Sequence, residues 1–213
     1  IVRLSGPCAS ERAREVFAQA PAPPGQAWHR QPGYRAWRGA VRFSRLATVP
    51  ATLFLLRHPA SYTREDMVEF HLPGAPLLLR RLLQLLLDHG ARLARPGEFT
   101  QRAFLNGRLD LPSAEGVLGT IEAGNRRTLK EARWLAGGAL EKRLAEPLRR
   151  LDELAVQAEL ACDFSDDVPP PPAEFFGNEL KYLASALDHL LRHSRLLSAG
   201  EALPRILLWG KSN

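Results

Sequence analysis

Cysteine and lysine are scarce in this chain of 213 residues, which contains two cysteines and four lysines. Cys8 and Cys162 lie far apart and belong to no CxxC or Cys/His cluster, so the spacing indicates neither a metal site nor a disulfide scaffold. Such sparse use of cysteine is typical of a reducing cytoplasm. We therefore expect a cytoplasmic protein.

Long apolar runs are missing as well. The most apolar run, Pro76–Leu87, is interrupted by Arg80, Arg81 and Gln84 and is too short to cross a bilayer, and no signal-peptide pattern opens the sequence. We therefore expect no membrane partner. Because the chain starts on Ile1 rather than Met, we also expect that a preceding segment is missing.

The charge balance is positive, with a formal net charge of +6 and a pI near 9.9. A basic chain favours an acidic partner such as RNA. Abundant Arg, Ala, Leu and Pro beside scarce Lys are also typical of a genomic bias. A solvated, arginine-rich surface is therefore an equal alternative.

Length and composition favour two domains. A chain of this length with 45% hydrophobic residues can bury one large core or two small ones, and its pattern changes from strand-rich to helical near residue 107. We expect an α+β domain over residues 1–107 and an all-α helical bundle over 108–203. Residues 204–213 form a short third segment with a strand-like start.

The first domain is expected to combine one mixed sheet with three helices. Its predicted strands are Ile1–Leu4, Arg35–Phe43, Ala51–Leu56 and a run over Met67–Phe70, with the second and third as antiparallel neighbours. Its predicted helices are one capped by Ser10, one from Pro76 to about His89, and a short one capped by Thr100.

The stretch Arg95–Leu111 marks the boundary between the two domains. Pro-Gly and Asn-Gly pairs flank the short helix within it. Arg95, Arg102 and Arg108 surround that helix, an arrangement that suits an anionic or polar ligand. Three solvated arginines are the simpler interpretation of the same spacing.

From Leu111 onward the apolar period is helical. We expect a helix that starts near Ser113 with Val117, Leu118 and Ile121 on its inner face, then Arg126–Ala136, Ala139 to about Cys162, and an antiparallel return over Phe175–Leu197. Pro147 predicts a kink in the long helix. Bundle packing is the expected role of the leucine stripes.

A short motif closes the chain, where Gly210, Lys211 and Ser212 follow the strand-like run Arg205–Trp209. Gly-Lys-Ser ends a phosphate-binding loop, yet the full signature needs Gly five positions before Gly210, where Arg205 stands. The triplet alone is weak evidence. We interpret these three residues as the remnant of a nucleotide-binding loop.

Spacing alone reveals no Ser/His/Asp arrangement, no paired carboxylates of obvious geometry and no metal motif. Glu65, Asp66 and Glu69 lie on a predicted strand, where Glu65 and Glu69 share one face and Asp66 takes the other. Solvated carboxylates at a sheet edge are the simpler interpretation. The residues themselves therefore predict a binding domain.

Four segments carry a resemblance to a known family. They are IVRLSG at Ile1–Gly6, SYTREDMVEF at Ser61–Phe70, PGEFTQRAFLNGRLDLPSAE at Pro96–Glu115 and ELACDFSDD at Glu159–Asp167. In this order they resemble the N-terminal and helical domains of the tRNA-modification GTPase family MnmE, also called TrmE.

The resemblance implies a tetrahydrofolate-binding-domain-like N-terminal domain that forms a homodimer and binds 5-formyl-tetrahydrofolate or a related formyl-folate. The family's ligand residues correspond to Arg3, Glu69 and Arg108, the last of which is Lys in the family. It also implies a G domain, beginning within residues 204–213, that hydrolyses GTP with potassium and magnesium. A FAD-dependent MnmG-type partner would complete modification of the wobble uridine of tRNA.

The sequence departs from the family pattern near this proposed pocket. Pro73-Gly74-Ala75-Pro76 replaces the usual His-Gly-Gly-Pro run, and Arg64 stands where the family usually has Gly. A rival hypothesis is therefore a non-catalytic dimerisation or scaffold module that has lost folate binding. A free-standing aminomethyltransferase-like domain is a third, although the long helical part argues against it.

Overall fold

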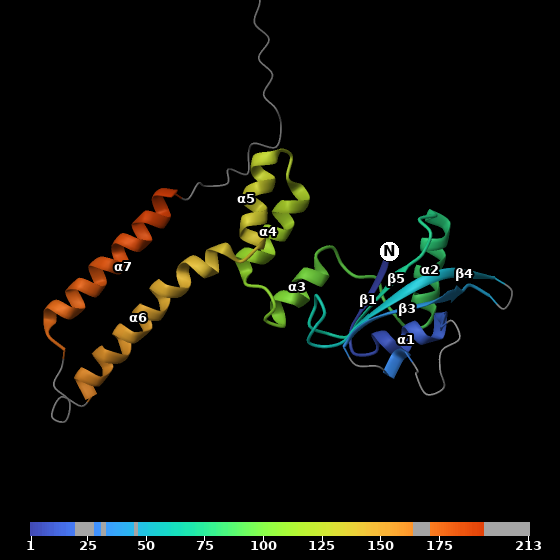
Figure 1. The fold of residues 1–213 in the computed structure, drawn as a ribbon, viewed down its shortest axis with the longest axis horizontal. Helices are drawn as coiled ribbons and strands as arrows, with labels where there is room; N and C mark the ends of the chain where they lie inside the picture. Colours follow the sequence, from blue (N-terminus) through green and yellow to red (C-terminus); the bar gives the residue numbers. More distant parts are fainter. Residues whose placement is uncertain (20–27, 31–32, 45–46, 164–170, 194–213) are drawn as a thin grey trace, which may run out of the picture. The chain divides into compact units, whose positions relative to one another are not determined.

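The computed structural model describes residues 1–19, 28–30, 33–44, 47–163 and 171–193. It divides into two compact units, Ile1–Leu118 and Gly119–Asn213. The first unit is built on a sheet and the second is helical, so the predicted succession of an α+β part and an all-α part is confirmed (Figure 1). The predicted strand and loop over residues 204–213 lie outside the described residues.

A five-stranded sheet organises the first unit, in the order β1-β5-β4-β3-β2. The strands are β1 (Val2–Ser5), β2 (Phe17–Gln19), β3 (Tyr34–Arg42), β4 (Thr48–Leu56) and β5 (Met67–His71). Every pairing is antiparallel, so the prediction of a mixed sheet is wrong. β2 was also missed, because Phe17 continues the apolar stripe of the preceding helix and a three-residue strand has too few positions to show alternation.

Alternation along β4 explains which face of the sheet is buried. Ala51, Leu53 and Leu55 are at most 8% exposed, whereas the residues between them are partly exposed. The register places Leu53 beside Phe70 and Leu55 beside Val68, both fully buried. One face of the sheet therefore forms the core, and the other carries the alternate side chains.

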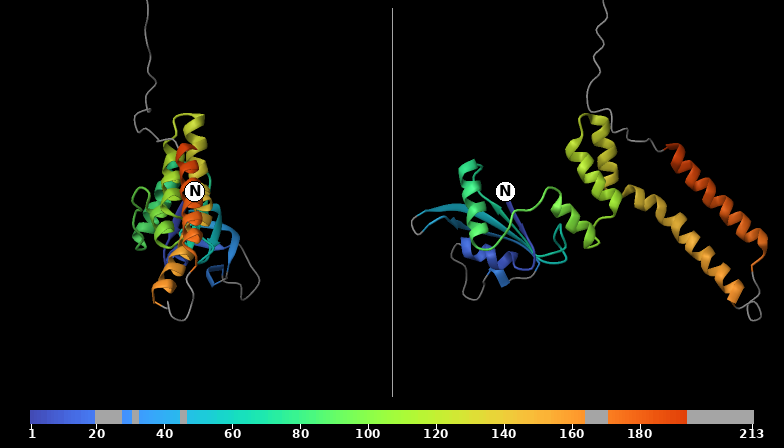
Figure 2. Two further views of the ribbon diagram at one scale, coloured as in Figure 1. Left: turned by 90° about the vertical axis from the view of Figure 1, so that its left-hand side faces the viewer. Right: turned by 180° about the vertical axis from the view of Figure 1, so that it is seen from behind.

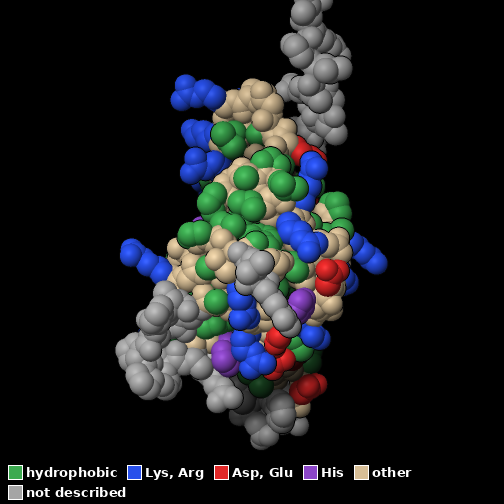
Figure 3. Space-filling model, turned by 90° about the vertical axis from the view of Figure 1, so that its right-hand side faces the viewer, with side chains coloured by type: hydrophobic (Ala, Val, Ile, Leu, Met, Phe, Trp, Pro, Cys, Tyr) green, Lys and Arg blue, Asp and Glu red, His purple; other side chains and the backbone are tan. Residues whose placement is uncertain are grey.

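Helices α1 (Ala9–Val16) and α2 (Pro76–Asp88) pack on the core face through Ala13, Leu82 and Leu86. As predicted, proline opens α2, and the chain turns after it through Gly90 at φ 85°. Figure 3 views this unit from the side of α2, where apolar side chains gather among arginines. A short 3₁₀ turn, η1 (Trp28–Arg30), adds the buried Trp28 to the core.

Two predicted helix caps are wrong. α1 begins at Ala9 without a side-chain cap, and Ser10 is buried where it accepts a hydrogen bond from Arg57. α3 (Glu98–Leu105) begins after Gly97 at φ 75°, and the hydroxyl of Thr100 instead lies 3.1 Å from that of Tyr62. In both places a tertiary partner takes the hydroxyl that sequence spacing assigns to the helix end.

Four helices follow α3. They are α4 (Leu111–Glu122), which spans the division between the units, α5 (Arg126–Ala136), α6 (Ala139–Asp163) and α7 (Ala173–His193). Pro147 lies inside α6, and α7 returns antiparallel beside it (Figure 2). Leu154 and Leu183 are buried, whereas Leu148, Leu151, Leu180, Leu187 and Leu191 are at least 45% exposed.

The predicted inner face of α4 is wrong in its composition. Leu118 and Ile121 are 55% and 78% exposed, whereas Ser113 and Gly116 are the buried residues of this helix. Small residues let a helix approach its neighbours closely, so they form the inner face although they contribute little to an apolar pattern. Within the described residues, no helix is long and apolar enough to cross a membrane.

The core of the first unit should be more sensitive to truncation than its apolar surface. Leu53→Ala removes a fully buried side chain and should lower the free energy of unfolding by about 2–5 kcal/mol. Leu105→Ala, at a residue that is 70% exposed, is the matched control and should change it by less than about 0.5 kcal/mol. Urea denaturation of the 213-residue chain measures both; equal losses would contradict the assigned core.

Candidate functional site

Strand pairing brings together two of the three predicted ligand residues. β1 and β5 place Arg3 directly opposite Glu69, and Arg3 Nε lies 2.7 Å from Glu69 Oε1. In the same register the amide of Gly6 donates to Asp66, so the Arg3–Glu69 pair falls at a non-hydrogen-bonded position, where facing side chains come closest. Both side chains project from the face opposite the core.

The carboxylate of Glu69 is oriented by a second neighbour. His71 Nε2 lies 3.0 Å from Glu69 Oε2, and the centre of the His71 ring lies 4.6 Å from that of the Phe54 ring, with the two rings tilted by 56°. Burial alone would raise the pKa of Glu69, but hydrogen bonds from His71 and Arg3 outweigh it and lower this pKa below its ordinary value. Glu69 is therefore an ionised acceptor with lone pairs left for a ligand.

The third predicted residue has contacts of its own. Arg108 Nη1 donates to the carbonyl of Ser61 at 2.8 Å, and its guanidinium lies 5.5 Å from the centre of the Tyr62 ring. Across the described ranges, no hydrogen bond or ion pair joins Arg108 to Arg3 or Glu69. The structure thus holds Arg108 against the loop that precedes β5, while Arg3 and Glu69 lie on the sheet.

Glu65 and Asp66 are not strand residues, so the predicted sharing of a face by Glu65 and Glu69 is wrong. Both lie in the loop before β5, which starts at Met67. Asp66 forms an ion pair with Arg57 and accepts the amide of His58. In the sequence these two residues look like a continuation of the strand. In the structure the loop directs both carboxylates toward partners within the unit.

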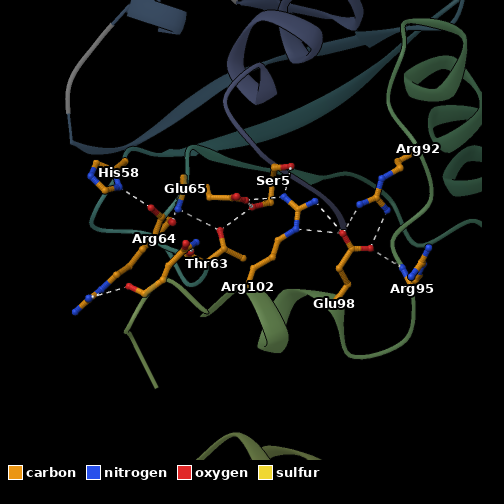
Figure 4. A network of polar contacts seen from close by, with 11 residues as sticks. Ser5, His58, Thr63, Arg64, Glu65, Arg92, Arg95, Glu98 and Arg102 are labelled. Carbon is orange, nitrogen blue, oxygen red and sulfur yellow. Dashed lines mark hydrogen bonds and ion pairs between the residues drawn. The ribbon is translucent and has the colours of Figure 1, made fainter. Parts of the chain in front are cut away.

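A polar network of several residues surrounds α3, and it was not predicted from the sequence (Figure 4). Glu98 is only 8% exposed and accepts hydrogen bonds from the side chains of Arg92 and Arg102 and from the amide of Arg95. These hydrogen bonds, led by the one from Arg92, hold the pKa of Glu98 far below its ordinary value. The i, i+4 spacing of Glu98 and Arg102 was the available signal.

Arg102 links this network to the first strand. Its Nη1 lies 2.7 Å from Glu65 Oε2, which also accepts a hydrogen bond from Ser5 at 3.0 Å. The hydroxyls of Ser5 and Thr63 are 2.6 Å apart. Because Ser5 and Arg3 project from the same face of β1, this network fixes the strand that carries Arg3.

The arrangement can hold an anionic or polar ligand beside an ionised carboxylate, with no sign of a catalytic nucleophile. Within the part of the chain that the structure describes, no three His, Cys, Asp or Glu side chains gather as metal ligands would. Arg3 is 56% exposed and Glu69 is 18% exposed, so both can be reached from solvent.

Comparison with known proteins assigns this geometry to a family. The family model for the N-terminus of the GTP-binding protein TrmE matches residues 1–108. The chain belongs to the MnmE/TrmE family. This unit therefore contains the N-terminal domain of that family, and the family predicted from the sequence is confirmed.

Relatives in several organisms extend the match into the helical unit. A tRNA modification GTPase MnmE of Nostoc sp. is 39% identical over 197 residues, which cover 90% of this chain and 41% of the relative. The MnmE of Picosynechococcus sp. is 42% identical over 200 residues, covering 91% and 41%. That of Chlorobium phaeobacteroides is 39% identical over 207 residues, covering 95% and 43%. The chain thus spans about two fifths of the length of these relatives.

Glu98 should make stability depend on pH. Its folded-state pKa lies below the ordinary 4.5, so the ionised carboxylate stabilises the fold above that pH and loses this effect as the pH falls below it. Glu98→Gln should therefore destabilise the chain at pH 7, and the difference from wild type should shrink below about pH 5. Urea denaturation from pH 7 to pH 3 measures it.

Glu115→Gln, at an exposed residue of α4, is the control and should follow wild type throughout. If the gap between wild type and Glu98→Gln stayed constant down to pH 3, the carboxylate would not be held by the arginines as described.

Proposed function

We propose that this chain forms the folate-binding and helical parts of a tRNA-modification GTPase. The full protein would use a formyl-tetrahydrofolate one-carbon unit, together with an MnmG-type FAD-dependent partner, to modify the wobble uridine of tRNA. The observation that carries the proposal is the oriented Arg3–Glu69 pair, at 2.7 Å, in a chain whose relatives are named tRNA modification GTPases.

Glu69 is suited to bind the pterin ring. A carboxylate oxygen has two acceptor positions, and each oxygen of Glu69 uses one of them for Arg3 or His71. The remaining positions can accept the amide and amino hydrogens at the edge of a pterin. His71 and Phe54 lie beside the carboxylate and limit its rotation.

Arg3 and Arg108 are suited to the negative end of the ligand. A guanidinium can hold the carboxylates of a glutamate tail bidentately, and both side chains are exposed. Arg108 is positioned by Ser61 and Tyr62, which leaves further donors of its guanidinium for a ligand. We propose that one ligand contacts both the Arg3–Glu69 pair on the sheet and Arg108 beside the loop before β5.

GTP binding belongs to the full-length protein in this proposal. Gly210, Lys211 and Ser212 would begin its phosphate loop, and they lie outside the described residues. Potassium and magnesium would act in that G domain. We also propose a cytoplasmic homodimer formed by the N-terminal domain, as the family resemblance implies.

Titration of 5-formyl-tetrahydrofolate into the 213-residue chain tests the folate site. Glu69→Ala should weaken binding about ten- to a hundredfold, because pterin donors lose their acceptor. Arg108→Lys should weaken it less, since charge is kept while the bidentate fork is lost. Glu15→Ala, at an exposed carboxylate on α1, is the control and should bind as wild type does.

Unchanged binding in Glu69→Ala would remove the site as assigned. An absence of binding in wild type would favour the scaffold hypothesis, with the Pro73-Gly74-Ala75 turn as the first place to look. In that turn the amide of Ala75 donates to the carbonyl of Pro73 at 2.8 Å, which fixes the path of the chain out of β5.

The proposed homodimer has its own test. Light scattering of the chain at tens of micromolar, a concentration above the dissociation constant of an ordinary stable dimer, should give about twice the monomer mass of 23.7 kDa. The apolar outer face of α2, with Leu77 78% exposed, offers surface for such contact. A monomer mass at that concentration would contradict dimerisation.

A further inference from the structure

One short segment of the helical unit carries a marked net positive charge of its own. Residues 126–143 contain six Arg or Lys and two Glu, so they carry a net charge of +4 where the whole chain carries +6. Two of the four lysines of the chain lie here as well. The segment covers all of α5 and the first turns of α6.

Within α5 the cations lie on a single face. Arg126, Lys130 and Arg133 are spaced four and three residues apart, which aligns them along about 10 Å of helix surface. All three are exposed. The packing face is a different one, since Ala132 is buried and lies next to Gly119 of α4.

Among the described residues, ion pairing separates the cations of this unit into two sets. In the described part of the chain, no ion pair involves Arg126, Lys130, Arg133, Lys142 or Arg143. Arg149 pairs with Glu146 and Glu153, Arg150 with Glu146 and Glu179, and Arg192 with Asp188. The described part of the unit therefore contains some cations that are neutralised by ion pairs and others that have no ion-pair partner.

The first turn of α5 carries positive charge, which the helix dipole disfavours at that end. Asn125 and Thr128 form a capping box, so this helix end is well defined. Its first turn holds Arg126 and Arg127 and no acidic residue, although the helix dipole disfavours cations there. Glu131 offsets Arg127 at 3.2 Å, but Arg126 is not offset. An uncompensated cost of this kind is typical of a functional surface.

An exposed aromatic ring adjoins the basic face. Trp134 is 40% exposed, and the guanidinium of Arg143 from α6 lies 5.2 Å from the centre of its ring. Cations that follow a phosphate backbone beside an aromatic ring on which a base can stack are the usual elements of single-stranded nucleic-acid binding. A surface that only needed to be solvated would not require the ring.

We propose that α5 and the start of α6 form an RNA-binding face, in which Arg126, Lys130 and Arg133 contact phosphates and Trp134 with Arg143 stacks on an unpaired base. The choice of RNA rests on the proposed function, because a tRNA offers unpaired loop bases next to closely spaced phosphates. The basic face itself is independent of the folate site.

The salt dependence of RNA binding distinguishes binding through this face from binding through the overall positive charge of the chain. Anisotropy of a labelled tRNA transcript is measured with the 213-residue chain from about 50 to 200 mM KCl. The triple variant Arg126→Gln, Lys130→Gln, Arg133→Gln should bind at least tenfold more weakly at the lower salt concentrations. The slope of log K against log salt should fall by about two to three.

The matched control is the triple variant Arg149→Gln, Arg150→Gln, Arg192→Gln, which removes the same charge from paired, partly exposed positions. It should keep the wild-type slope. Circular dichroism checks that both variants remain helical, and the single change Lys130→Gln, with an expected slope change of about one, serves if a triple variant unfolds. Equal losses in the two triples, or no loss in the first, would overturn the proposal.

Trp134→Ala tests the stacking part of the proposal. It should weaken tRNA binding roughly five- to a hundredfold while leaving binding of heparin, a polyanion without bases, unchanged. Equal weakening for both polymers would show that the ring only supports the helix. If folate titration failed while these RNA results held, the folate site alone would be wrong; the reverse outcome would remove the RNA-binding face alone.

Discussion

The contact on which the first unit depends is the one between Glu98 and Arg102, extended by Arg92 and Glu65. Ala103 is the only buried hydrophobic residue of α3, so apolar packing alone would hold this helix weakly. A carboxylate that is 8% exposed needs donors on every side, since an unpaired buried charge is costly. The network therefore selects one position of α3 against the loop before β5, and a single missing partner would leave the others unsatisfied.

The proposed ligand site is built on the same network. Ser5 is fixed by Thr63 and Glu65, and two residues earlier the strand presents Arg3 to Glu69. Regular strand pairing is then sufficient to place the two side chains together, because facing residues at a non-hydrogen-bonded position lie close to each other without any special loop. The position of Arg3 next to Glu69 therefore follows from the register of β1 and β5. That register is fixed at one end by α3, whose Arg102 shares Glu65 with Ser5 of β1.

The sequence predicts the features of this unit that depend on neighbouring residues better than those that depend on residues distant in the chain. The hairpin of β3 and β4 and the bounds of α2 follow from local alternation and helix-end signals, and both are confirmed. The caps at Ser10 and Thr100 failed because Arg57 and Tyr62, distant in sequence, take those hydroxyls. Of the candidate site, the contact of Arg3 with Glu69 was predictable from the family resemblance alone, and the role of Glu98 was not.

The meaning of the positive net charge could not be read from composition, which left an acidic partner and a solvated surface as equal alternatives. The structure instead distinguishes the arginines that form ion pairs from those that do not. In the first unit Arg57, Arg92 and Arg102 are occupied by Asp66, Glu98 and Glu65, so they contribute to the fold and little to an external field. On α6 and α7 neutralised pairs recur at i, i+4 spacing. Where cations without ion-pair partners share one helix face, as Arg126, Lys130 and Arg133 do on α5, their charge becomes a local potential that a polyanion can sense.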